Sequence, residues 1–382
     1  PIESSAPAAG TTVSPTEGNV AATSEPISEE SSEATPDDEG PFVVHEWGTF
    51  TSVQTSDGYN LSGLHHEEEA LPPFVQNYAY HGVYDQETLD GEVFNDNMSR
   101  IKGMPFLPGP ITQKLETPVV YFYGKPDAAE VKVQFPKGLI SEWYPKHTEL
   151  GPLNLRQGVG DGFMAWDVEL SNSADLVEVP EDDIWAPSRN VPDARYVTNA
   201  NQSDRFIFYR GVGQFEMPFD VSVSEEGQYE LRNTSAQSVS HVFVLEVKED
   251  TGHIYEVGGV EGFDEETFMP APKEMPKPIS TMVGEAKTKV SRALVDTGLT
   301  RDEADAMVDT WERSYFKKPG HRILYVVPRR WTDELLPMEI TPKPDELVRT
   351  LVGRIDVLTP TAERGMVERV RASFDARDDG IV

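Results

Sequence analysis

The feature that most limits how this chain can fold is a series of short segments, between residues 41 and 265, in which apolar and polar residues alternate. A period of two indicates strands with one buried face, whereas a helix repeats its apolar residues every three or four positions. The first segment, FVVHEWGTFTSV from Phe42, places His45 and Trp47 on one strand face and Glu46 on the other. Residues 41–265 are therefore predicted to form a β-rich, antiparallel, sandwich-like domain.

Turn residues predict how these strands are joined. A Lys-Pro-Asp turn separates VVYFYG (119–124) from AEVKVQFP (129–136), and this arrangement predicts a hairpin. Four strands with short polar turns between residues 219 and 260 predict a β-meander.

After residue 265 the apolar period changes to that of helices. Thr300, followed three residues later by Glu303, forms a capping-box pattern that predicts a helix start. Residues 352–358 fit either a strand or a helix. The segment 266–382 is predicted to be a mixed helical and strand region that packs on the β body, which makes the fold class α+β.

A last helix is predicted to begin near Thr359 and Pro360. Its apolar residues recur at helical spacing, so we expect this helix to bury Ala362, Val367, Val370 and Phe374.

Residues 1–40 have a different composition, rich in Ser, Thr, Pro, Ala, Gly and Glu. They contain nine acidic residues, no Lys or Arg and few large apolar residues, so this leader is predicted to be disordered. The chain begins at Pro1, and we expect that a secretory signal has been removed from it. A stalk of this kind favours an exported protein, periplasmic or at the cell surface.

The charge balance excludes several partners. The chain has 66 acidic and 33 basic residues, and without the nine leader acids 57 remain against 33, a charge of −24. Such a surface repels nucleic acid and anionic membranes, and it suits high salt and cationic or divalent-metal partners. No apolar run approaches the roughly 18–20 residues of a transmembrane segment. The lack of Cys excludes thiol catalysis, Cys-based zinc sites and disulfides.

One cluster has the residue types of a metal site. His65-His66-Glu67-Glu68-Glu69 could supply nitrogen and oxygen ligands to a divalent metal, although it is not an HExxH motif. The predicted metal residues are His45, His65, His66 and Glu68, and no other cofactor is evident. The alternatives are a solvated charged loop at 65–69 and a hydrogen-bonded core histidine at His45.

Two further charged residues stand in predicted strands. Glu142 neighbours Trp143, as carboxylates do in many glycan sites, and Arg210 could clamp a carboxylate or form a structural salt bridge. The sequence contains no G-x-S-x-G elbow, P-loop or EF-hand loop.

Several strings resemble those of a family of exported bacterial proteins without an established activity, whose body opens with His-Glu-Trp-Gly-Thr-Phe. The strings include VHEWGTFTSV, LETPVVYFYG, FPKGLISEWYP, FYRGVG and YVVPRRW, and the resemblance covers most of residues 41–360. It implies a bacterial, exported protein and assigns no residue roles.

Three hypotheses of function follow. The first is an exported binding protein for an envelope or extracellular ligand. The second is a metal-dependent hydrolase or oxidoreductase that uses His45, His65 and His66, with Glu46 or Glu68 as the base. The third is a structural component of the envelope.

Overall fold

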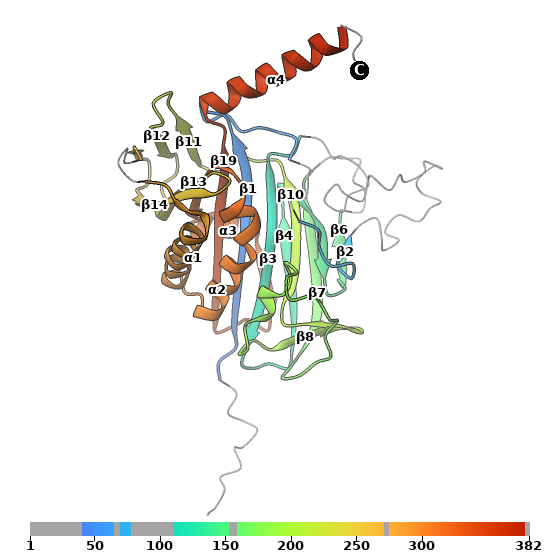
Figure 1. Ribbon diagram of the computed structural model, residues 1–382. Helices are drawn as coiled ribbons and strands as arrows, with labels where there is room; N and C mark the ends of the chain where they lie inside the picture. The colour runs from blue at the N-terminus through green and yellow to red at the C-terminus, as the bar shows by residue number, and fades with distance from the viewer. Residues whose placement is uncertain (1–39, 65–68, 78–109, 153–158, 271–274, 379–382) are drawn as a thin grey trace, which may run out of the picture. The chain divides into compact units, whose positions relative to one another are not determined.

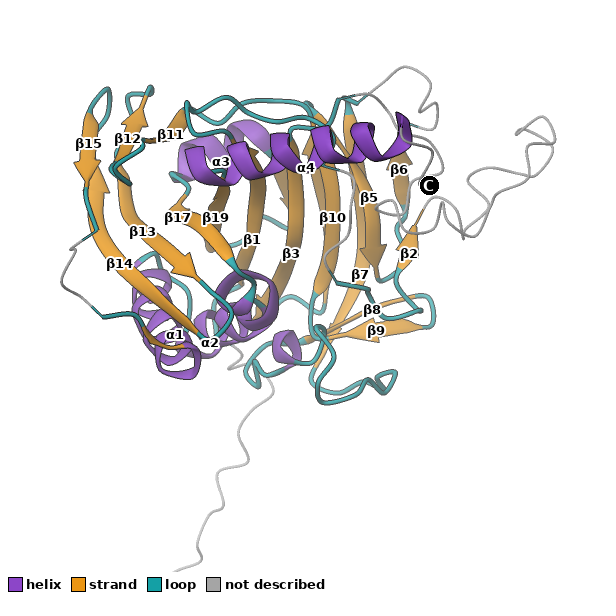
Figure 2. Ribbon diagram, turned by 45° about the horizontal axis from the view of Figure 1, so that its top comes forward, coloured by secondary structure: helices purple, strands orange, loops and turns teal. Residues whose placement is uncertain are grey.

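The largest element of the structure is a ten-stranded sheet. The computed structural model describes residues 40–64, 69–77, 110–152, 159–270 and 275–378. The strands of this sheet are β1 (Val43–Gln54), β2 (Gln76–Asn77), β3 (Gln113–Tyr123), β5 (Gly138–Tyr144), β10 (Ile207–Gly213), β13 (Val239–Val247), β14 (Thr251–Val260), β16 (Lys277–Pro278), β17 (Gly320–Val326) and β19 (Glu346–Val357). Their order is β16-β14-β13-β17-β19-β1-β3-β10-β5-β2 (Figure 2).

Two smaller sheets pack on one face of the large sheet. The first contains β4 (Ala128–Phe135), β6 (Glu149–Gly151), β7 (Gly162–Ser171), β8 (Tyr196–Asn199), β9 (Gln202–Asp204) and β18 (Met338–Thr341). The second contains β11 (Phe219–Val223), β12 (Tyr229–Asn233) and β15 (Glu265–Phe268). A shared core joins Val44 and Phe50 of β1 to Val131, Trp166 and Leu231 of the small sheets. The alternating residues of β1 therefore face two different cores, whereas its alternation predicted a strand with one buried face.

Helices cover the opposite face of the large sheet. They are α1 (Ile279–Asp296), α2 (Arg301–Thr310), the short 3₁₀ helix η3 (Pro187–Arg189) and the π-helical turn η4 (Glu312–Lys317). The core on this side joins Trp47 and Tyr121 to Met282 and Met307. The predicted capping box is confirmed, because Thr300 and Glu303 exchange both hydrogen bonds at the start of α2.

The fold class is α+β, as predicted, with a mostly antiparallel body. Among the described strands, β1 and β19 form the one parallel pair. Strands on both sides of residue 265 belong to the large sheet, since β17 and β19 lie between β13 and β1 (Figure 2). The domain boundary at 265/266 stays a prediction.

The predicted strand connections were wrong in two places. The segments of the expected hairpin at 119–136 lie in different sheets, because β3 pairs with β1 and β10 whereas β4 pairs with β7 and β18. The expected meander is two hairpins, β11–β12 and β13–β14, also in different sheets. Turn residues indicate where the chain reverses, but they do not specify which strand the next segment joins.

The last helix, α4 (Pro360–Asp378), forms where it was predicted, but its apolar face is not buried. Val367, Val370 and Phe374 are 48%, 55% and 61% exposed, and α4 extends beyond the ends of the strands (Figure 1). Helical spacing identifies an apolar face without identifying what covers it. Two other helical segments, α3 (Arg329–Leu335) and η3, are short. None of the described helices is long and apolar enough to cross a membrane.

A bulge in the β1–β3 ladder requires a glycine. The register between the strands shifts at Gly48, and a Cβ added there would lie 2.9 Å from the Cα of Pro118. On the other strand Thr117 adopts a φ of 48°, which is unusual for a β-branched residue. The Gly of the His-Glu-Trp-Gly-Thr-Phe string therefore permits close approach of the two backbones.

Gly48→Ala is expected to destabilise the protein by about 1–3 kcal/mol, because the contact is with backbone that cannot move aside cheaply. Gly284→Ala is the matched control, since no heavy atom lies within 4 Å of a Cβ added at that helix position. It is expected to stabilise by about 0.5–1 kcal/mol. Chemical denaturation measures both changes, and equal effects of the two substitutions would contradict the close approach at Gly48.

Candidate functional site

An ion pair joins β1 to β19 inside the core between the sheets. Arg349 lies opposite Glu46 in the parallel register, and its Nε donates to Glu46 Oε2 at 2.6 Å. Both side chains are at most 1% exposed. Although burial opposes its charge, Glu46 and the nearby Asp333 hold the pKa of Arg349 above its ordinary value. The Tyr209 hydroxyl donates to the other oxygen of Glu46, and burial, reinforced by Glu46, raises the pKa of Tyr209.

His45 has a carboxylate partner on the helix-covered face of β1. Its Nδ1 lies 2.8 Å from Glu303 Oε2, and Glu303 is fully buried at the start of α2. Tyr123 donates to Glu303 Oε1 at 2.6 Å, and the backbone N–H of Thr300 donates to Oε2 at 2.7 Å. This cluster ties α2 to β1 and β3, and it accounts for the burial of His45.

Further charged side chains lie on strands β3, β5 and β10, on the helix-covered face of the large sheet and next to the Gly48 bulge. Arg210 of β10 and Glu142 of β5 are cross-strand partners and form a buried ion pair. On β3, Lys114 Nζ lies 3.0 Å from Glu116 Oε1, and Glu116 is opposite Thr49 of β1. Buried charges of this kind need partners, and each of these has one.

A small cavity lies over this charged group. Its volume is about 20 Å³, enough for one water molecule or one ligand group. Residues from five separate parts of the chain line it, including Glu69, Glu116, Thr117, Arg210, Trp311 and Tyr315. The roof comes from the end of α2 and from η4, and π-helical turns are frequent at functional sites.

The cavity adjoins a wider, open cleft with a volume of about 640 Å³. Glu69, Ile184 and Ser314 line both spaces, so the cavity lies at the inner end of the cleft. The cleft also contains Asp182, Asp183, Arg313 and Lys318. A space of this size lies within the range that small-molecule sites occupy.

The cavity offers both a hydrogen-bond donor and an aromatic surface. The indole N–H of Trp311, a residue that is 1% exposed, has no acceptor among the described residues. The rings of Trp311 and Tyr315 stack with centroids 4.9 Å apart. Trp47 has a second buried indole N–H without an acceptor in the described part of the chain, but of the two only Trp311 lines the cavity, where a water molecule or a ligand group can accept its hydrogen bond.

The charges of the cavity and cleft leave one carboxylate in excess. The count includes the residues that line the two spaces and the ion-pair partners of Glu116 and Arg210. The acidic residues are Glu69, Glu116, Glu142, Asp182 and Asp183, and the basic residues are Lys114, Arg210, Arg313 and Lys318. The arrangement can therefore attract a small ligand with a cationic group, and its donor suits an oxygen acceptor.

The predicted metal site stays a prediction. His65, His66 and Glu68 lie outside the described residues, and His45 contacts Glu303. Within the described ranges, no three His, Asp or Glu side chains are placed to hold a metal ion. Sequence reasoning noted Glu142 and Arg210 separately, and the structure brings them together. It missed Glu116 and Tyr315, because no local motif indicates which strands and turns meet at the cavity.

Comparisons with known proteins do not identify a family. No family model and no curated protein matches the chain. Two similar solved structures are the mu-homology domain of yeast delta-COP-I, alone and in complex with a Dsl1 WxWxV peptide. Each aligns with a TM-score of 0.28 and covers 84% of this chain and 97% of that chain, at 8% and 7% identity respectively. A similarity this low carries no argument about the site.

Removing one partner of the buried Glu46–Arg349 ion pair is expected to destabilise the protein. Glu46→Gln leaves Arg349 with only the half-exposed Asp333 as counter-charge, 3.0 Å from its Nη1, and should lower the free energy of unfolding by about 3 kcal/mol. Glu334→Gln is the control, because Glu334 forms an exposed pair with Arg330, with a 2.9 Å separation between Nε and Oε1. The control should change stability by less than about 1 kcal/mol. A loss at Glu46 no larger than the control's would contradict a structural role for the pair.

Proposed function

We propose that the protein is an exported binding protein whose cleft holds a small ammonium compound that also carries an oxygen acceptor, such as an amino acid or a betaine. The cationic group would lie near Glu69 and Glu116, and the acceptor would receive the hydrogen bond of Trp311. The observation that carries the proposal is the unpaired, buried indole N–H beside a cavity at the inner end of a charged cleft. The acidic leader composition supports export to the periplasm or cell surface.

The stacked pair of Trp311 and Tyr315 already contacts one cation of the protein, because the guanidinium carbon of Arg354 lies 4.3 Å from the Tyr315 ring centroid, so a ligand cation would contact Trp311. Aromatic faces attract ammonium groups, most strongly where water is excluded. The cavity has room for one group of the size of a water molecule, such as a primary ammonium group, and the wider cleft has room for a trimethylammonium group or for the rest of a small molecule.

Ligand binding should appear as a saturable rise in thermal stability. Glycine, glycine betaine, arginine and a diamine are the probes, each compared with NaCl at equal ionic strength, because salt alone relieves repulsion in a chain of charge −33. At about 100 times Kd a bound ligand stabilises by about 2.7 kcal/mol. A ligand without an oxygen acceptor, the diamine, should bind more weakly than the amino acids. Stabilisation by all probes no greater than that of NaCl would contradict the proposal.

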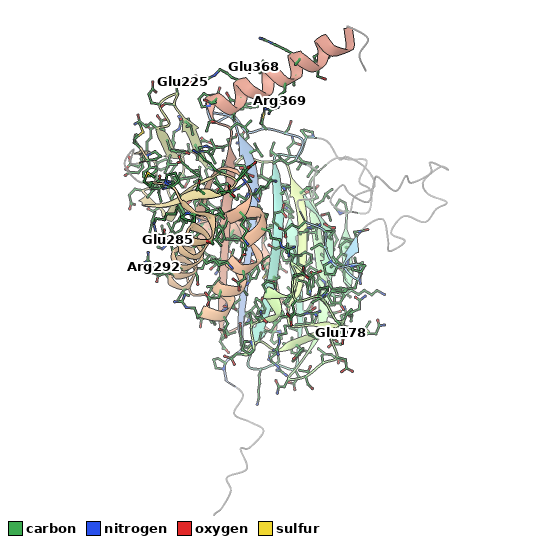
Figure 3. All side chains as sticks on the ribbon, in the orientation of Figure 1. Glu178, Glu225, Glu285, Arg292, Glu368 and Arg369 are labelled. Atoms are coloured by element: carbon green, nitrogen blue, oxygen red, sulfur yellow. The ribbon has the colours of Figure 1, made fainter. Side chains whose placement is uncertain are left out.

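Substitutions locate the binding. Trp311→Phe keeps the ring and removes the donor, and it should weaken binding by about 3- to 10-fold, the effect of one hydrogen bond. Trp331→Phe is the matched control, because that indole donates to Gln237 at 3.2 Å in the other core. Glu69→Gln should also weaken binding, whereas Glu285→Gln on α1 (Figure 3) should not. Equal effects of a variant and its control would place the ligand elsewhere.

One observation favours the metal-dependent hydrolase or oxidoreductase as a second candidate. Glu69, which lines both cavity and cleft, directly follows His65-His66-Glu67-Glu68 in the sequence. If this candidate is right, untagged protein should contain nearly stoichiometric divalent metal by elemental analysis. The His65→Ala, His66→Ala double variant should lose that metal. Protein that is free of metal in both forms would contradict this candidate and leave the ammonium-binding proposal intact.

A further inference from the structure

The helix α4 is attached to the rest of the protein only near its first turn, as far as the described contacts show. The carboxylate of Glu363 accepts hydrogen bonds from the backbone N–H and the hydroxyl of Ser56, at 2.6 and 2.9 Å. Arg364 pairs with Glu225 on the surface. From Met366 to Phe374 every residue is exposed. Figure 3 shows Glu368 and Arg369 on this outer part of the helix.

This outer part is short for a helix without tertiary support. Isolated helices of fewer than about 12–15 residues are marginal in water, because most helical stability in proteins comes from packing of the apolar face. Here that face consists of Met366, Val367, Val370 and Phe374, between 41% and 61% exposed. The stability of α4 in solution therefore calls for a partner on this face.

The apolar residues have the spacing of a helix-pairing seam. Val367, Val370 and Phe374 follow one another at intervals of three and four residues, as the a and d positions of a coiled coil do. If two copies of α4 pair antiparallel about a two-fold axis at Val370, each Met366 lies opposite the Phe374 of the other copy. The face is thus complementary to itself, which is the requirement for a two-fold interface.

Charge also selects a second copy as the partner. From Pro360 to Asp378 the helix has four acidic and four basic residues, in a chain whose net charge is −33. The α4 helix therefore has no net charge. Two copies can pair through it while their acidic bodies stay apart, so the repulsion between the bodies is small. An anionic lipid surface is a poor partner for this face, because α4 has no excess of positive charge. The leader is also a poor partner, because it has nine acidic residues and few large apolar ones.

We propose that the protein forms a homodimer through the antiparallel pairing of its α4 helices, along the face formed by Met366, Val367, Val370 and Phe374. This proposal is independent of the cleft and its ligand. The pairing holds two copies together through helices that lie outside both cores, so each body keeps its cleft open.

Sedimentation velocity on the full chain tests the dimer. The protein concentration is raised from about 1 to about 200 µM, a range that covers weak to moderate dimer Kd values. The apparent mass should rise with it, from the 42.5 kDa of one chain toward twice that value. Val370→Glu places two like charges at the two-fold axis and should raise the dimer Kd at least about 100-fold. Ala372→Glu adds the same charge on the opposite face of the helix and should leave the Kd within about threefold of the wild-type value.

Both substituted positions are exposed in one chain, so both variants should fold, which near-ultraviolet circular dichroism checks. Phe374→Glu is a second disrupting variant if Val370→Glu fails to fold. A wild-type protein that stays monomeric over the whole range would overturn the proposal. So would equal loss of dimer in Ala372→Glu and Val370→Glu, or a monomer that binds vesicles of zwitterionic lipid through this face.

Discussion

The structure depends on the parallel pairing of β1 with β19, which brings together residues about 300 positions apart in the chain. Twelve consecutive residues pair across it, and the Glu46–Arg349 ion pair lies in register within the core. A slip by one residue would move Arg349 to the helix-covered face and leave Glu46 buried without its partner. The pair therefore makes the correct register much more stable than its neighbours, whatever its net contribution to stability. Because β19 also pairs with β17, this one register positions the C-terminal strands in the sheet.

The candidate site follows from the same arrangement. The side chains of β1 that face away from Glu46 contact the helices, and His45 holds the start of α2 through Glu303. That contact positions Trp311 at the end of α2 and Tyr315 in η4 over the charged residues of β3 and β10. The cavity wall is completed by Ile184 and Glu69 from connecting segments. A ligand in the cavity would contact all of these parts at once, so binding and the stability of this face should be coupled.

The sequence predicted the features that depend on neighbouring residues. The two faces of β1, the capping box of α2 and the position of α4 all follow from spacing within a few residues. It did not predict that β3 and β4 separate into two sheets, because their pairing depends on strands elsewhere in the chain. The site was predictable only as parts: Glu142 and Arg210 were noted from local patterns, but their pairing arises from the β5–β10 register. The exposure of α4 was not predictable, because a helical apolar face is the same pattern whether the protein's own core or a second chain covers it.

The central claim is that the cavity beside Trp311 receives the ligand, and the indole N–H resonance of Trp311 tests it most directly. Nuclear magnetic resonance of nitrogen-15-labelled protein should give six indole signals, and the signal absent from Trp311→Phe identifies that of Trp311. During titration with glycine betaine or an amino acid at constant ionic strength, we expect the Trp311 signal to shift saturably while that of Trp331, already bonded to Gln237, stays in place. A Trp311 signal that does not move while the protein is stabilised by the ligand would contradict the account.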